Sequence, residues 1–256
     1  MELREKRVGV ESLKKEYLSF KLTDNSKVRF KKEHSNTFSL ASGRPEHGGT
    51  CAHATQGEGG CVGKCYDQNL RKLYKNYASV EDYNTSLVIE ADYETQRKII
   101  DNSVTKWLLQ GAHTDPYFRI HTGGDFFNES YARAWASVIE QRSEVHFWVY
   151  TRSLFAVPIL AELKNITLLL SCDPVNKEDV LAVYEEYKNY NHISVAYMGN
   201  ELPDDMPGDR NWLLCPEVTN KMKKLEGKGA CARCRACIDR PLKTGKIRHI
   251  QFPIHR

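Results

Sequence analysis

The sequence predicts an α/β protein whose core is a parallel (β/α) barrel or partial barrel. Short apolar segments alternate with helical segments along most of the chain, at the spacing typical of βαβ units. These apolar segments do not alternate between apolar and polar residues, which indicates strands that are covered on both faces. Because at least six such units fit between residues 37 and 214, a barrel or partial barrel is favoured over a doubly wound sheet.

The predicted elements follow one another in a regular order. The segment YLSFKLTDNSKVRFKK predicts an N-terminal β-hairpin around the turn TDNS. Strands are then predicted at residues 37–42, 117–121, 145–150, 166–171, 193–198 and 211–215. Helices are predicted from Tyr66 to about Gly111 with turns near Asp82 and Asp92, at 128–142 with Asn128 as the N-cap, at 154–163 and at 176–190.

Three segments organise the chain: an N-terminal hairpin at 1–36, the core at 37–214 and a cysteine-rich extension at 215–256. The extension contains 11 Lys and Arg against 3 Asp and Glu, whereas the preceding residues are net acidic. This basic charge offsets a thiolate metal centre or forms a surface for phosphates or nucleic acid; the composition favours neither. No apolar segment is long enough to cross a membrane, and the N-terminus has no secretory pattern.

The eight cysteines therefore belong in a reducing cytoplasm, where metal binding or catalysis explains them better than disulfides. Cys51, Cys61 and Cys65 occupy one glycine-rich loop that can wrap closely around a bound group. Three thiolates can hold three corners of a cubic iron–sulfur cluster and leave one iron open. The same loop could instead bind zinc, with His47 or His53 as the fourth ligand.

A second group of cysteines lies in the extension and consists of Cys215, Cys231, Cys234 and Cys237. Its C-x2-C-x2-C spacing favours an iron–sulfur cluster over zinc, which more often uses paired C-x2-C knuckles. The remaining cysteine, Cys172, is expected to be a buried thiol rather than a ligand.

Polar residues follow the predicted strands at the ends where parallel α/β folds gather their ligands. These are His121 to Asp125 after the second core strand, Thr151-Arg152-Ser153 after the third and Ser171-Cys172-Asp173 after the fourth. Each also has a purely structural interpretation. Asp125 could cap the following helix, Arg152 could form an ion pair, and His121 is expected to be a core histidine.

The cysteine loop with its ending CVGKCY resembles the cluster loop of the radical S-adenosylmethionine (SAM) superfamily, here with longer spacing. The sequence TGGD resembles the Gly-Gly-Glu motif of that superfamily, with aspartate in place of glutamate. The chain also resembles the phage family called Gene Product 88. That resemblance rests on Cys65-Tyr66, Gly124-Asp125, Tyr150 to Ser153, Ser171 to Asp173 and the C-terminal cysteines.

The superfamily resemblance implies an enzyme with two [4Fe-4S] clusters that uses SAM for radical chemistry on an unknown substrate, with an electron donor as partner. It implies that SAM lies near Gly123, Gly124, Asp125, Arg152 and Ser171. The phage resemblance implies the cytoplasm of an infected bacterium. Two alternatives remain open: a nucleic-acid-binding protein with structural iron–sulfur or zinc sites, and a nuclease that binds magnesium through Asp125 and Asp173.

Overall fold

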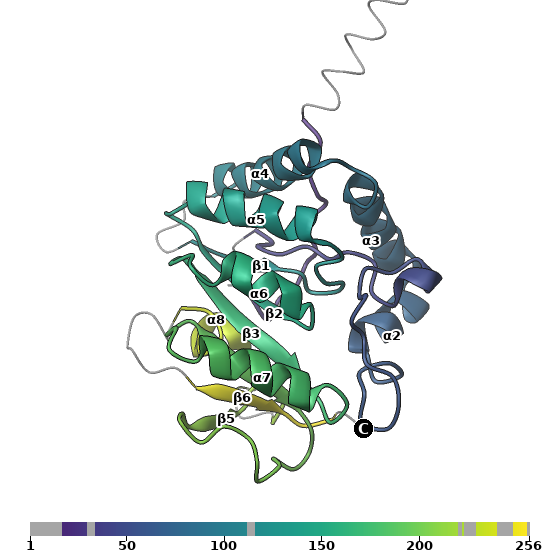
Figure 1. Cartoon of the computed structure of the whole chain (residues 1–256). Helices are drawn as coiled ribbons and strands as arrows, with labels where there is room; N and C mark the ends of the chain where they lie inside the picture. Colours follow the sequence, from purple (N-terminus) through teal and green to yellow (C-terminus); the bar gives the residue numbers. More distant parts are fainter. Residues whose placement is uncertain are drawn as a thin grey trace, which may run out of the picture.

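The structure is a computed structural model that describes residues 17–29, 34–111, 116–219, 222, 229–239 and 248–254. At its centre is a six-stranded sheet in the order β1-β2-β3-β4-β6-β5, and all neighbouring strands are parallel (Figure 1). The strands are β1 (Tyr117–Ile120), β2 (His146–Thr151), β3 (Ile166–Cys172), β4 (Ile193–Met198), β5 (Trp212–Leu214) and β6 (His249–Phe252). The predicted α/β class and parallel sheet are confirmed, but the sheet is open, with β1 and β5 at its edges, and the described strands close no barrel.

The helices follow the predicted order, with one long segment divided into three. They are α2 (Tyr66–Leu73), α3 (Lys75–Val88), α4 (Tyr93–Leu109), α5 (Glu129–Gln141), α6 (Val157–Leu160), α7 (Lys177–Tyr187) and α8 (Ala230–Cys234), with 3-10 turns η1 (Pro45–His47) and η2 (Leu154–Ala156). Asp92 begins α4 by accepting a hydrogen bond from the Thr95 amide at 2.8 Å. Asn128 caps α5 as predicted, whereas the turn predicted near Asp82 is wrong because that residue lies within α3.

The N-terminal hairpin is not confirmed. Residues 17–29 contain no strand, and the second predicted strand extends into residues 30–33, outside the described ranges. The strand predicted at 37–42 is reduced to one parallel bridge between Thr37 and Arg119. Backbone hydrogen bonds from Thr122 to Phe38 at 2.9 Å and from Leu40 to Gly123 at 3.0 Å continue the contact past the end of β1.

The two faces of the sheet are covered differently. Side chains on one face, such as Phe147 and Leu168, pack in the larger core beneath α4, α5, α6 and α7. Side chains on the other face, such as Trp148 and Leu169, pack against α8 and the C-terminal cysteines. Figure 1 shows α5, α6 and α7 across the front of the sheet and α8 behind it. Coverage on both faces explains why the strands lack a polar side.

Strand β6 was not predicted, and it lies between β4 and β5. Ile250 is opposite Ala196 of β4 and Leu213 of β5, so this residue joins the last two strands to the rest of the sheet. The segment after Cys215 therefore supplies a strand as well as cysteines. In the described part of the chain, no helix combines the length and apolar character needed to span a bilayer.

Replacing Ile250 with alanine should lower the free energy of unfolding by about 2–4 kcal/mol, because its side chain is fully buried and truncation leaves a cavity. The matched control is Leu214→Ala, since Leu214 ends the neighbouring strand and is 41% exposed. That variant should change stability by less than about 0.5 kcal/mol. Urea unfolding of both variants tests the placement of β6, and equal losses would contradict it.

Candidate functional site

The loop that carries the first cysteine group is held tightly at its start. The amide of Cys51 donates to the Gly43 carbonyl at 2.8 Å, and the amide of Thr50 donates to the Ala41 carbonyl at 2.8 Å. A Cβ on Gly49 would lie 2.0 Å from the Gly43 carbonyl oxygen, so glycine is required there. This close approach of the backbone determines where Cys51 lies.

The middle of the loop is bound to the carboxyl end of β3. The amide of Cys61 donates to the Thr55 hydroxyl oxygen at 2.8 Å, and that hydroxyl donates to the Asp173 carboxylate at 2.5 Å. Gly59 lies against Pro174, where a Cβ would approach the proline ring to 2.9 Å. These contacts join the Cys61 region to a residue more than 100 positions later in the chain.

Cys65 occupies the N-cap position of α2. Burial raises the pKa of its thiol and the nearby Asp67 carboxylate raises it further, while the backbone amides of Gln68 and Asp67 oppose the rise. Amide groups at a helix N-terminus favour a thiolate in this way. Because the pKa is raised overall, Cys65 would serve as a thiolate ligand only if the bound group offset its burial.

The three loop thiols influence one another electrostatically. Burial raises the pKa of the Cys51 thiol, the nearby Asp125 carboxylate raises it further, and Cys65 and Cys61 act in the same direction. All three cysteines are only partly exposed. Three thiolates in such a place repel one another, and a bound cationic group would relieve that repulsion.

Arg152 lies beside this group, at the carboxyl end of β2. Its Nη2 donates to an Asp173 oxygen at 3.0 Å, whereas its buried Nε has no hydrogen-bond partner in the described residues. Burial disfavours the charged guanidinium, but the nearby Cys61 and Asp173 groups raise the pKa of Arg152 above its ordinary value. The side chain therefore remains charged and has one donor free.

Asp125 binds the end of β2 and does not cap a helix. Its carboxylate accepts from the Thr151 hydroxyl at 2.6 Å and from the Arg152 amide at 2.8 Å, and it also accepts from its neighbour Phe126. Burial raises its pKa, and these hydrogen bonds oppose the rise. The role of the carboxylate within the chain is to position Arg152.

The two glycines of TGGD allow close packing of the chain itself. A Cβ on Gly123 would lie 2.3 Å from an Asp67 carboxylate oxygen, and one on Gly124 would lie 2.6 Å from the Thr50 hydroxyl. Gly124 also has a φ of +81°, which favours glycine. Ser171 lies on β3, and its carbonyl accepts a hydrogen bond from the Asn176 side-chain amide at 2.9 Å.

The second cysteine group lies against the face of the sheet that α8 covers. All four members pack against the smaller core on that face, as do Tyr150, Leu213 and Phe252. Burial raises the pKa of Cys231 to about 12, partly opposed by the positive charge of Arg119, and the other cysteines raise it. Burial also raises the pKa of Cys237, while the Tyr150 phenol stabilises its thiolate by hydrogen bonding. These four thiols are thus close enough to act on one another.

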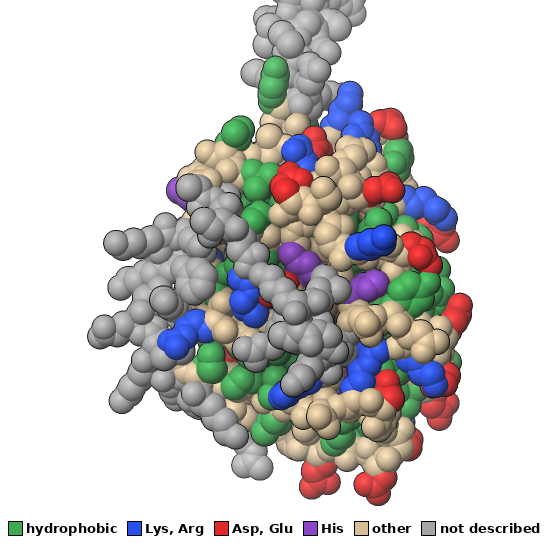
Figure 2. Space-filling model, turned by 90° about the vertical axis from the view of Figure 1, so that its left-hand side faces the viewer, with side chains coloured by type: hydrophobic (Ala, Val, Ile, Leu, Met, Phe, Trp, Pro, Cys, Tyr) green, Lys and Arg blue, Asp and Glu red, His purple; other side chains and the backbone are tan. Residues whose placement is uncertain are grey.

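Most basic residues of the C-terminal extension, including Lys221, Lys223, Lys224 and Lys228, lie outside the described residues. The predicted phosphate or nucleic-acid surface therefore stays a prediction. On the side of the molecule seen in Figure 2, the described Lys and Arg side chains are interspersed with Asp and Glu and form no single basic patch.

The other cysteine and histidine side chains considered as ligands lie in ordinary surroundings. Cys172 is buried in the main core, as expected. His121 is also a buried core residue, bonded to Tyr131 at 3.1 Å, and burial lowers its pKa to about 3. His47 and His53 are exposed, and His53 lies against the Phe155 ring. No group of three or more His, Cys, Asp or Glu side chains among the described residues is arranged to hold a metal ion.

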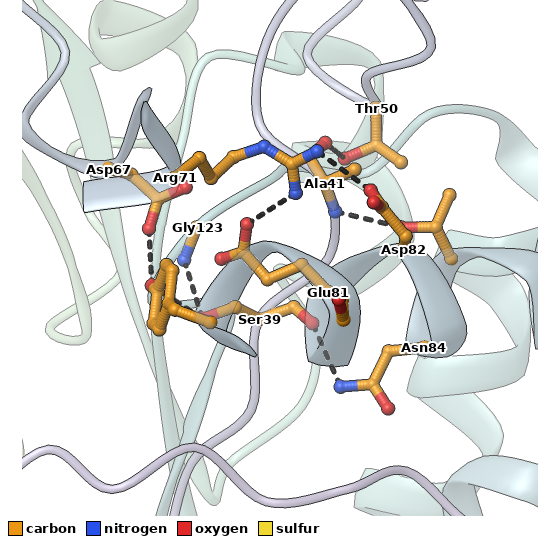
Figure 3. Close-up of polar contacts among 12 residues, drawn as sticks. Ser39, Ala41, Thr50, Asp67, Arg71, Glu81, Asp82, Asn84 and Gly123 are labelled. Atoms are coloured by element: carbon orange, nitrogen blue, oxygen red, sulfur yellow. Dashed lines mark hydrogen bonds and ion pairs between the residues drawn. The ribbon is translucent and has the colours of Figure 1, made fainter. Parts of the chain in front are cut away.

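A buried acidic pair beneath the loop was missed by the sequence analysis (Figure 3). Asp67 accepts from the Tyr77 hydroxyl at 2.5 Å, and Arg71 donates to Glu81 and to Asp82, each at 2.7 Å. One oxygen of Asp67 and one of Glu81 lack hydrogen-bond partners. Asp67 comes two residues after Cys65, but the pairing with α3 depends on how two helices pack, which no local pattern reveals.

Comparison with known proteins places this chain in a phage family. The model of the family described as Gene product 88 matches residues 12–240. The chain belongs to the Gene product 88 family. It is 33% identical over 211 residues to the Gene 88 protein of Mycobacterium phage D29, covering 80% of this chain and 83% of that protein. It is 31% identical over 210 residues to the Gene 88 protein of Mycobacterium phage L5, with the same coverage.

No solved structure matches the chain significantly. The family match confirms the resemblance to phage proteins that the cysteine and strand-end motifs indicated. The names of these relatives state no activity, so the chemistry must be argued from the cysteine groups and their surroundings.

Glu81 should make stability depend on pH. Burial raises its pKa from an ordinary 4.5 to about 8, and the nearby Asp67 carboxylate adds to the rise. Folding therefore takes up a proton between these pH values, and the free energy of unfolding should fall as pH rises from about 5 to 8. Glu81→Gln should flatten this dependence, whereas Asp82→Asn, at the exposed end of the same ion-pair network, should preserve it. Unfolding at several pH values tests this, and equal slopes in wild type and Glu81→Gln would contradict it.

Proposed function

We propose that this protein is a radical SAM-type iron–sulfur enzyme that acts on an unknown substrate. The observation that carries the proposal is a loop of three partly buried thiols that Thr55 joins to Asp173 at the end of β3, beside a charged arginine with an unpartnered donor. Three cysteine ligands leave one iron of a four-iron cluster available to another molecule. A cluster with a purely structural role does not need an iron with a free coordination position.

The residues present fit a cluster better than a single zinc ion. The described residues contain no set of ligands grouped around one ion, although the three thiols interact electrostatically. In a cubic cluster each thiolate binds a different iron, so its ligands lie farther apart than the ligands of zinc. Backbone amides at the α2 N-terminus favour the Cys65 thiolate without outweighing its burial, and the positive charge of Arg152 lies near Cys61.

The fit for SAM rests on Arg152. A buried Nε without a partner is an unsatisfied donor, and such donors are rare in proteins. A carboxylate, such as that of the methionine part of SAM, would satisfy it and pair with the charge. When bound, SAM and a reduced cluster together supply a carbon radical that removes a substrate hydrogen.

The neighbouring residues have positioning roles in this proposal. Asp125 holds the backbone of Arg152, and Asp173 holds both its guanidinium and, through Thr55, the cysteine loop. With three hydrogen bonds already accepted, Asp125 can also accept one from an ammonium group. The absence of side chains at Gly123 and Gly124 allows the residues around the cysteine loop to pack closely against the end of β1.

The second cysteine group is proposed to hold an auxiliary cluster. Its thiols pack with apolar side chains of the sheet, so metal binding there stabilises α8 and the adjoining strands. This contribution to folding is compatible with either an enzyme or a structural metal protein. The first group alone separates these alternatives.

Anaerobic reconstitution should load about eight irons per chain, as two four-iron clusters. Cys61→Ala and Cys234→Ala should each reduce this to about four, and Cys234→Ala should also lower the melting temperature because its site contributes to folding. The matched control is Cys172→Ala, a buried cysteine outside both groups, which should keep the full iron content. Zinc without iron in protein prepared without oxygen would overturn the proposal.

SAM should bind the reconstituted protein and change the paramagnetic resonance spectrum of the reduced first cluster. Arg152→Gln should weaken SAM binding by about 1.5–3 kcal/mol, the usual contribution of a hydrogen bond to a charged group. Calorimetry should show no change for Arg133→Gln, because Arg133 is exposed on α5. A wild-type protein that carries both clusters but binds no SAM at millimolar concentration would leave a structural role for the metal.

A further inference from the structure

The second cysteine group lies on a short piece of chain whose two ends are held by different partners. At the end near Cys237, the Ile238 carbonyl accepts a hydrogen bond from the Thr167 hydroxyl at 2.5 Å and another from Nε2 of His146 at 2.7 Å. These partners lie on the neighbouring strands β3 and β2. This end of the cysteine-bearing chain is therefore attached to the sheet itself.

The end near Cys231 is held by residues 25–29, from the opposite end of the sequence. The Lys27 carbonyl accepts a hydrogen bond from the Cys231 amide at 2.9 Å, and the Arg29 carbonyl accepts one from the Gly229 amide at 3.2 Å. Both amides lie at the start of α8, where a helix leaves its backbone donors without internal partners. The 25–29 segment supplies those partners, so it determines where α8 begins.

The contact between this segment and α8 leaves no room for a side chain. A Cβ on Gly229 would lie 2.4 Å from the carbonyl oxygens of both Lys27 and Ser26. Gly229 has a φ of −62° and a ψ of 144°, which other residues adopt readily, so the close approach alone requires glycine. The two pieces of backbone therefore pack directly against each other.

The 25–29 segment is also fixed to the core and to β1. The Val28 side chain is fully buried in the smaller core, against which the four cysteines of the second group pack. The Val28 carbonyl accepts a hydrogen bond from the Asn36 side-chain amide at 3.2 Å, and the same amide donates to the Tyr117 carbonyl at 3.1 Å. The segment thus transmits the position of β1 to the start of α8.

Lys27 contacts two separate parts of the second group. Its carbonyl binds the Cys231 amide, and its ammonium group pairs with Glu217, two residues after Cys215, at 2.8 Å. The ion pair is partly exposed and adds little energy by itself. Its significance is positional, because Cys215 and Cys231 are distant along the chain and Lys27 contacts the backbone or side chains beside both.

We propose that the 25–29 segment is part of the second metal centre: it positions Cys231 relative to Cys215, and bound metal in turn fixes the segment in place. The inference rests on the proposed function only in that the second group binds metal; it requires neither SAM nor the first cluster. Groups that position metal ligands typically change metal affinity by about 10–100-fold. Because such coupling is reciprocal, metal should stabilise the packed segment by the same factor.

The first test measures how firmly the second group holds iron. Cys61→Ala with Cys65→Ala leaves only that group, and this background is reconstituted anaerobically with iron and sulfide. Val28→Ala loosens the segment without altering α8 and should speed the loss of iron to a chelator about tenfold. The matched control is Val104→Ala, a fully buried valine of α4 in the larger core. It should lower the melting temperature comparably and leave iron loss unchanged.

A second variant acts on the same contact from the side of α8. Gly229→Ala places a methyl group where the Lys27 and Ser26 carbonyls lie, so it should also speed iron loss, by about tenfold or more. Gly208→Ala is its control, because a Cβ there meets nothing within 4 Å. The same chelator assay, run well below the melting temperature, compares the two variants.

Hydrogen exchange tests the reverse effect without altering the segment. The Val28 amide donates to the Asn25 carbonyl at 3.1 Å, and loading the second group with its cluster should slow exchange of this amide about tenfold. The Lys21 amide, which donates to Asn84 of α3 at 2.8 Å, should exchange at the same rate with and without metal. A purely structural role of the segment would leave both rates unchanged on loading.

Equal iron loss from Val28→Ala and Val104→Ala would overturn this inference and leave the proposed function intact. So would exchange of the Val28 amide that does not respond to metal, a measurement that needs no substitution in the segment. Failure of the background protein to take up iron would instead overturn the proposed auxiliary cluster, and the inference with it.

Discussion

The hydrogen bonds of Asp173 are the constraint on which the candidate site depends. This buried carboxylate follows β3 and contacts both Thr55 of the cysteine loop and Arg152 after β2. One side chain therefore sets the positions of a proposed metal ligand and of the nearest cation. A glycine-rich loop loses much conformational entropy when it is ordered, so such contacts are needed to hold it before any metal binds.

The parallel sheet explains why these residues meet. Because β1, β2 and β3 are parallel, their carboxyl ends lie on the same side of the sheet. Residues from three segments that are distant in the sequence therefore come close together there. The cost is visible in the electrostatics, because burial and neighbouring negative groups raise the pKa of Cys51 and of Asp125. Perturbed groups gathered at one place are typical of functional sites, where a bound ligand offsets the unfavourable interactions.

The local pattern of apolar and polar residues in the sequence was sufficient to predict most helices and strands and some residues of the candidate site. It located α5 with its Asn128 cap, the apolar strands β2 to β5 and the strand ends where Asp125 and Arg152 lie. It did not reveal that β6 enters between β4 and β5, because strand order depends on contacts between distant segments. The hydrogen-bond partners of Asp125 and the Asp67–Glu81 pair were missed for the same reason.

The open sheet gives the two cysteine groups different surroundings. The first lies near the carboxyl ends of β2 and β3, among polar side chains such as Asp173 and Arg152, whereas the second lies against a sheet face among apolar side chains. A metal centre proposed at the strand ends would have a position open to a further ligand, whereas one packed into a core would chiefly contribute to folding. Arg119 on β1 lies over the Trp148 and Tyr150 rings of β2, so a positive charge lies on the sheet face that the second group covers.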